Sequence, residues 1–205
     1  MEREVNTVPN ARQIGLVLLL GCAVVVLSFA YLDVPIARWF SQNLGHLGAG
    51  LSSATLLSLD AATALFLVAE RLVRGQLSAM SKTLAIACLT SMCAYAVNDG
   101  VLKLFFGVPN PSRVLLEGAR HTFHFLSGDR DSSFPSGHMV LAGSFAGVFM
   151  RLYPSSIWPT CALLLFGSML LIVGDWHFAS DVIAGAFLGV STGALAGELW
   201  RVHSN

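Results

Sequence analysis

The sequence predicts an all-α protein, a polytopic bundle of six transmembrane helices. Of its 205 residues, 55% are hydrophobic and 12% are charged, and the mean hydropathy is +0.68. Soluble domains usually carry about twice that charged fraction. The formal net charge is zero, so nothing in the composition indicates a nucleic-acid partner. We therefore expect residues 1–205 to form a single integral-membrane domain in contact with the lipid bilayer.

Six apolar stretches qualify as membrane spans, each of which takes about 20 mostly apolar residues. They lie near residues 14–32, 50–72, 83–106, 138–153, 156–175 and 181–200. The fourth is short, so its polar entry must belong to the helix. The segment 33–44 mixes aromatic, aliphatic and charged residues, and we expect it to lie in the membrane interface.

The basic residues indicate an orientation, because short cytoplasmic loops carry an excess of Lys and Arg. The N-terminal side would hold Arg3, Arg12, Arg71, Arg74, Lys82, Arg151 and Arg201, and the opposite side Arg38, Lys103, Arg113, Arg120 and Arg130. Most of the second group lies in or beside one polar loop, 107–137, where a binding role would explain it. We therefore expect a cytoplasmic N-terminus and an outward-facing loop, in a bacterial-type inner or plasma membrane with the loop in the periplasm.

This loop is the longest polar segment, and it ends in Ser136, Gly137 and His138 at the start of the fourth span. Long loops in compact folds are usually functional or disordered. A helix N-terminus offers unpaired N–H groups and a partial positive charge, which together suit an anion. A solvated external loop without a binding role is the alternative.

A second candidate site lies at His177 and Asp181, whose spacing of four puts them one turn apart on the same helix face. A carboxylate in that position can hold one imidazole nitrogen and leave the other free as a nucleophile or base. Alternatively, Asp181 only caps its helix. In the six-helix topology this pair and His138 emerge at the same membrane face, which indicates a site that handles phosphate.

These residues resemble the three motifs of the type-2 phosphatidic acid phosphatase superfamily. The second motif, Pro-Ser-Gly-His, is intact at residues 135–138, and the third keeps its histidine and aspartate at 177 and 181. The first motif begins with Lys103 and ends at Pro111. The order of the motifs and the six spans also fit, so the resemblance covers roughly residues 50–200.

The resemblance implies a hydrolase that acts on lipid phosphates without a metal or other cofactor. His177 would attack phosphorus to give a phosphohistidine, and Asp181 would orient it. His138 would protonate the leaving oxygen and then activate water. The phosphoryl oxygens would be held by Lys103, Ser136 and the amide of Gly137.

Both family arginines are absent from their usual positions. Asn110 replaces the arginine of the first motif, and Leu170-Leu171 replaces the Ser-Arg of the third. One charge-assisted hydrogen bond contributes about 1.5–3 kcal/mol, so an active enzyme needs substitutes. Two arginines of the loop, Arg113 and Arg130, are the candidates.

Other readings remain open at this point. The same phosphohistidine could pass its phosphoryl group to an acceptor lipid, and a member of the fold without its arginines could be a non-catalytic lipid-binding or scaffold protein. An intramembrane serine protease would use Ser136 and His177, but the Gly-x-Ser-Gly pattern is absent before the fourth span.

Asp60, within the second span, is either functional or a structural hydrogen-bonding group. The particular lipid phosphate and the oligomeric state are left open.

One further pattern concerns packing between helices. Glycines recur every four residues within the fourth and sixth spans, at Gly143, Gly147, Gly185, Gly189 and Gly193. Small residues at such spacing let two membrane helices approach closely, and we expect these positions to be contact points.

Overall fold

The computed structural model describes residues 11–44, 53–129 and 131–204, and every regular element in these ranges is helical. This confirms the all-α prediction. The elements are α1 (Ala11–Leu27), the π-turn η1 (Ser28–Leu32), α2 (Asp33–Leu44), α3 (Ser53–Arg74), α4 (Ala79–Val97), the π-turn η2 (Asn98–Leu102), α5 (Lys103–Phe106), α6 (Pro111–Leu115), α7 (Gly137–Leu152), the 3₁₀ turn η3 (Pro154–Ser156), α8 (Ile157–Val173) and α9 (Ala179–Ser204).

Six longer helices coincide with the six predicted spans, although residues 50–52 of the second lie outside the described ranges. Four helical stretches are long and apolar enough to cross a membrane, namely Gly15–Leu44, Ala79–Leu115, Pro154–Val173 and Ala179–His203. The chain is therefore an integral membrane protein by length and composition. The helix α3 is not among these four, and the helix at Gly137–Leu152 is apolar but shorter, so a full set of six crossings stays a prediction.

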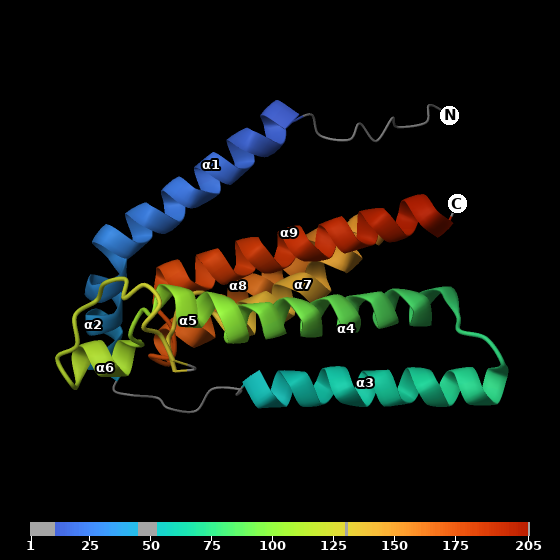
Figure 1. Ribbon diagram of the computed structural model, residues 1–205, viewed down its shortest axis with the longest axis horizontal. Coiled ribbons are helices and arrows are strands. Elements are labelled where there is room, and N and C mark those ends of the chain that lie inside the picture. Colours follow the sequence, from blue (N-terminus) through green and yellow to red (C-terminus); the bar gives the residue numbers. More distant parts are fainter. Residues whose placement is uncertain (1–10, 45–52, 130, 205) are drawn as a thin grey trace.

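Figure 1 shows α3, α4, α7, α8 and α9 nearly parallel or antiparallel, whereas α1 and α2 are inclined to them. The end of α4, the loop with α6 and the start of α9 gather at one end, beside α2. The α3–α4 turn and the C-terminus lie at the opposite end. Helix α1 approaches α9 at its own C-terminal end and diverges from it toward the N-terminus.

The packing of α7 against α9 is the most extensive among the described helices. It depends on the predicted glycines, because a Cβ on Gly147 would lie 2.4 Å from the carbonyl oxygen of Val190, and one on Gly193 would lie 2.0 Å from that of Ser144. Real Cβ atoms do not approach backbone oxygens so closely, so the two backbones are in direct contact. The prediction of close-packing positions is confirmed.

Two π-turns interrupt otherwise continuous helices, η1 between α1 and α2, and η2 between α4 and α5. Such turns are frequent at functional sites, because the extra residue per turn changes the direction in which the following side chains point. Here Asp33 directly follows η1 and Lys103 directly follows η2. The bend between α1 and α2 is visible in Figure 1.

The polar loop between α5 and α7 is attached to α5 by hydrogen bonds, although many of its side chains are exposed. Its backbone bonds back to α5 through His124 N–H to the Phe106 carbonyl at 3.0 Å and Leu126 N–H to that of Phe105 at 2.8 Å. Phe106, Phe123 and Phe134 also contact one another, with ring centroids 5.1–5.8 Å apart. The loop is therefore an ordered cap over this end of the bundle.

Candidate active site

Ser136 begins α7 as its N-cap, with its hydroxyl accepting the Met139 N–H at 3.4 Å. The turn before it is held from two sides. Asn98 of η2 donates to the Pro135 carbonyl at 3.1 Å, and the Ser136 N–H donates to the Asp181 carbonyl at 3.0 Å. Ser136 is fully buried. Hydrogen bonds thus hold the start of α7 to η2 and to α9, and His138 is the second residue of α7.

His177 lies immediately before α9, in a tight turn after α8. Its N–H donates to the Leu171 carbonyl at 3.3 Å, and the next N–H, that of Phe178, donates to Asp181 Oδ2 at 2.8 Å. Asp181 is fully buried in the first turn of α9. Its carboxylate therefore caps the helix, as one of the two sequence-based hypotheses expected, and it also faces His177.

The two histidines meet across α7 and α9. His138 Nδ1 lies 3.3 Å from His177 Nε2, and His177 Nδ1 lies 3.6 Å from Asp181 Oδ2. Both imidazoles are more than 90% buried. The second distance is longer than a hydrogen bond but short enough for the carboxylate to favour a proton on Nδ1. That leaves the lone pair of His177 Nε2 directed at His138, the arrangement that a nucleophile and an acid–base partner require.

Gly137 directly precedes His138, and Lys103 begins α5 at the end of the bundle where α9 also begins. The Lys103 side chain is largely buried at the start of α5, and its Nζ lies 3.4 Å from Asp99 Oδ1, one turn earlier. The two side chains therefore form an intrahelical ion pair. Gly137 packs so closely that a Cβ there would lie 2.9 Å from the Tyr95 ring. No group of three or more His, Cys, Asp or Glu side chains within the described ranges is arranged to hold a metal ion.

A family model for the PAP2 superfamily matches residues 82–202, which is more than half of the chain. The chain belongs to the PAP2 superfamily. The matched region contains Lys103, the 135–138 motif, His177 and Asp181, so the resemblance read from the motifs is confirmed. Neither the curated proteins nor the solved structures provided a significant match. Members of the PAP2 superfamily typically act on phosphate esters, which indicates that class of substrate here.

The two positions where PAP2 arginines are expected have structural roles in this chain. Asn110 caps α6, its Oδ1 accepting the Arg113 N–H at 2.9 Å. Leu171 is buried in a cluster with Met139 and Val182, and its carbonyl holds the His177 backbone. Neither replacement supplies a positive charge.

The proposed substitute Arg113 is half-exposed and contacts two carboxylates of its own loop. Its guanidinium lies 3.0 Å from Asp129 Oδ2 and 3.7 Å from Asp131 Oδ2. Burial alone would raise the pKa of Asp129, but the hydrogen bond and the charge of Arg113 together hold that pKa below its usual value. Arg130, the other candidate, lies outside the described residues. A phosphate-binding role for either arginine stays a prediction.

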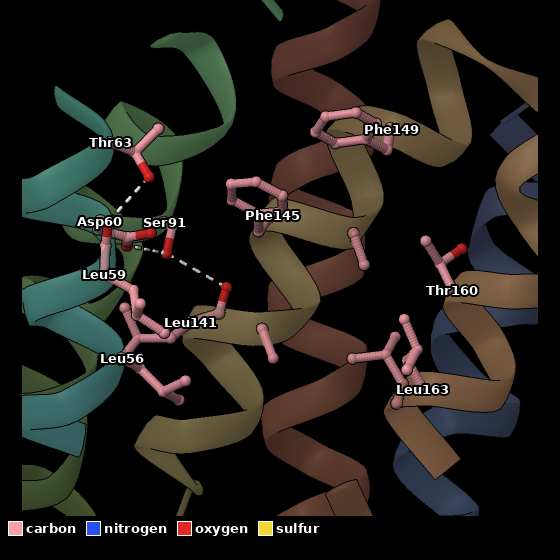
Figure 2. A pocket seen from close by; sticks show the side chains of 13 residues that line it. Leu56, Leu59, Asp60, Thr63, Ser91, Leu141, Phe145, Phe149, Thr160 and Leu163 are labelled. Atoms are coloured by element: carbon pink, nitrogen blue, oxygen red, sulfur yellow. Dashed lines mark hydrogen bonds between the residues drawn. The ribbon is translucent and has the colours of Figure 1, made fainter. Parts of the chain in front are cut away.

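Asp60 lies before the region matched to PAP2. It lines a cavity of about 440 Å³ between α3, α7 and α8. Figure 2 shows it turned toward Ser91 of α4, whose hydroxyl lies 2.9 Å from Asp60 Oδ2 and 3.2 Å from the Leu141 carbonyl. Asp60 therefore joins α3 to α4 by accepting a hydrogen bond from Ser91, as the structural interpretation expected.

Two residues near the site were not identified by any motif. Asn98 binds the turn before α7, and Asp33 binds the first turn of α9. Asn98 lies a few residues before Lys103, but Asp33 is far away in the sequence. A polar side chain in an apolar run was the only available indication for either residue.

Proposed function

We propose that this PAP2 protein is an integral-membrane phosphatase that hydrolyses a lipid phosphate or diphosphate at the outer membrane face. The observation that carries the proposal is the contact between His138 Nδ1 and His177 Nε2 at 3.3 Å, with Asp181 behind the second ring. A binding or scaffold protein has no use for a buried imidazole pair backed by a carboxylate. Family membership supports a phosphate ester as the substrate.

In the first step, His177 Nε2 attacks phosphorus, the N–P bond forms, and the P–O bond to the lipid breaks. His138 gives its proton to the departing lipid oxygen. In the second step, His138 takes a proton from water, the water oxygen attacks phosphorus, and the N–P bond breaks to release phosphate. Both steps are general acid–base catalysis, for which histidine is the side chain most often used. The rings, now in contact, must separate to admit the phosphoryl group.

Asp181 favours the correct His177 tautomer and stabilises the charge on the ring as the N–P bond forms. Lys103, Ser136 and the Gly137 N–H are assigned to the phosphoryl oxygens. The N-terminus of α7, with its partial positive charge, favours the same anion. Because these donors lie in a buried region, their interaction with developing negative charge is stronger than it would be in water.

The test is phosphate release by the purified protein from a panel of phosphatidyl, isoprenoid and lipid A phosphates in mixed micelles. We expect release from at least one, together with inhibition by vanadate, which mimics a five-coordinate phosphoryl group. Transfer of labelled phosphate to an added lipid alcohol would identify a phosphotransferase instead. Inactivity toward the whole panel would contradict the proposal and favour a binding protein.

The role assigned to Arg113 has its own test, Arg113→Gln. If the guanidinium leaves Asp129 to bind substrate phosphate, its loss removes a charge-assisted hydrogen bond worth about 1.5–3 kcal/mol, which raises KM by about 10- to 100-fold. Arg120→Gln, in the same loop and exposed, is the matched control. Steady-state kinetics on the best substrate give KM for both variants. An unchanged KM in Arg113→Gln would show that Arg113 does not bind the substrate phosphate.

A further inference from the structure

Asp33 is a buried carboxylate at the first residue of α2, and it lies outside the region matched to the family. It is only 1% exposed. Its neighbours come from η1, which directly precedes it, and from two distant parts of the chain, the loop between α5 and α7 (the outer loop) and the first turn of α9. A buried carboxylate is retained only where it is well paired, so this meeting point is a specific one.

The contacts with α9 use both carboxylate oxygens. Oδ1 accepts the Ser180 N–H at 2.8 Å, and Oδ2 accepts the Ser180 hydroxyl in a short hydrogen bond. Ser180 immediately precedes Asp181 and lies three residues after His177. Two bonds to one residue fix the rotation of the first turn of α9, and that turn carries the carboxylate that faces the nucleophile.

The contact with the loop is made by His121. Its Nε2 lies 3.3 Å from Asp33 Oδ2, and its ring packs against Phe29 of η1 and against Phe178, with centroids 4.2 and 4.3 Å apart. Phe178 is the residue directly after His177. The loop thus reaches the turn that carries His177 through two contacts of His121, one with the carboxylate that binds Ser180 and one with the Phe178 ring.

These groups do not form a second nucleophilic triad. The Ser180 hydroxyl donates to the carboxylate, not to the imidazole, and Ser180 is fully buried. A nucleophilic serine needs its proton directed at a histidine. The arrangement therefore suits a positioning role.

We propose that Asp33 and His121 form a clasp that positions His177, so that turnover requires the outer loop to be docked on the start of α9. The inference rests on the proposed phosphatase function and concerns the regulation of the same site. Asp33 holds the first turn of α9, and His121 ties the loop to Asp33. Undocking the loop would remove one of the partners of a buried carboxylate and the ring that packs on Phe178, and would loosen the turn that carries His177.

The experiment measures kcat and KM for Asp33→Ala, His121→Ala and the double variant. Misplacement of a reacting group by about 1 Å costs up to about 100-fold in rate, so we expect each single variant to lower kcat by about 10- to 100-fold with little change in KM. The double variant should lose less than the product of the two single losses in kcat, because His121 acts in part through Asp33. Asp33→Asn retains an oxygen for the Ser180 N–H and should recover part of kcat.

A readout independent of activity follows the loop itself. Trypsin should cleave after the exposed Arg120 faster in His121→Ala and Asp33→Ala than in the wild type. His124→Ala, three residues further along the same loop and with an exposed side chain, is the matched control and should behave as wild type in both assays. If Asp33→Ala does not fold, Ser180→Ala replaces it, because this substitution removes one hydrogen bond of the clasp. The test then uses the two single variants Ser180→Ala and His121→Ala.

The outcomes separate the two proposals. An active wild type with unchanged kcat in His121→Ala and Ser180→Ala overturns the clasp and leaves the phosphatase intact. A rise in KM at unchanged kcat, or losses that add fully in the double variant, also overturns it. A wild type inactive on every lipid phosphate overturns the proposed function, and the clasp's role in turnover with it.

Discussion

His177→Ala should abolish phosphate release, with a loss of at least about 1,000-fold in kcat, because the variant has no atom with which to form the phosphoryl-enzyme. His177 Nε2 is the nitrogen that faces His138, and Asp181 lies behind its other nitrogen. The phosphoryl oxygens would still meet Lys103 and the start of α7. Substrate binding should therefore persist, and KM should change much less than kcat.

The measurement is steady-state phosphate release together with trapping of the intermediate. Acid-labile label from a ³²P-lipid should appear on the wild type and be absent from His177→Ala. His203→Ala, at the far end of the same helix and exposed, is the control and should retain full activity. Wild-type turnover in His177→Ala would exclude a phosphohistidine at this position. In His138→Ala, a labelled protein that releases no phosphate would support the second step assigned to His138.

The second large effect concerns Gly193→Ala, a substitution that adds a single carbon. That Cβ would lie 2.0 Å from the Ser144 carbonyl oxygen and 3.0 Å from Gly147 Cα. Backbone atoms cannot rotate away as side chains can, so α7 and α9 must separate. Overpacking of this kind typically costs about 1–3 kcal/mol, and we expect a loss of that size in the free energy of unfolding.

Denaturation of the purified protein in detergent, followed by circular dichroism, measures this loss. Gly167→Ala makes the same chemical change in α8, where a Cβ would meet nothing within 4 Å. That control should be neutral or slightly stabilising, since alanine favours the helix over glycine. Activity should also fall in Gly193→Ala, because the α7–α9 contact sets the separation of the two histidines. Equal stability of the two variants would contradict direct backbone packing.

Part of the site was predictable because its determinants are local. Residues 135–138 form a cap and a first turn, and His177 lies four residues before Asp181 at the start of α9, so both patterns are local ones. Bringing the two together required only the order and direction of the spans. The role of Arg113 was not predictable in this way, because a charged loop residue can reach several partners, and here its guanidinium contacts Asp129 and Asp131.

The sequence by itself determined the helical membrane class, the family and the identity of the histidine pair, since hydropathy and residue spacing are properties of short segments. Only the tertiary structure decided that Asn98 holds the turn before α7 and that Asp33 holds the start of α9, across 147 positions of the chain. Such contacts depend on the two π-turns, which redirect the side chains that follow them, and on the glycines that let α7 and α9 touch. No local pattern encodes which distant backbone a redirected side chain will meet, because that is set by the packing of the whole bundle.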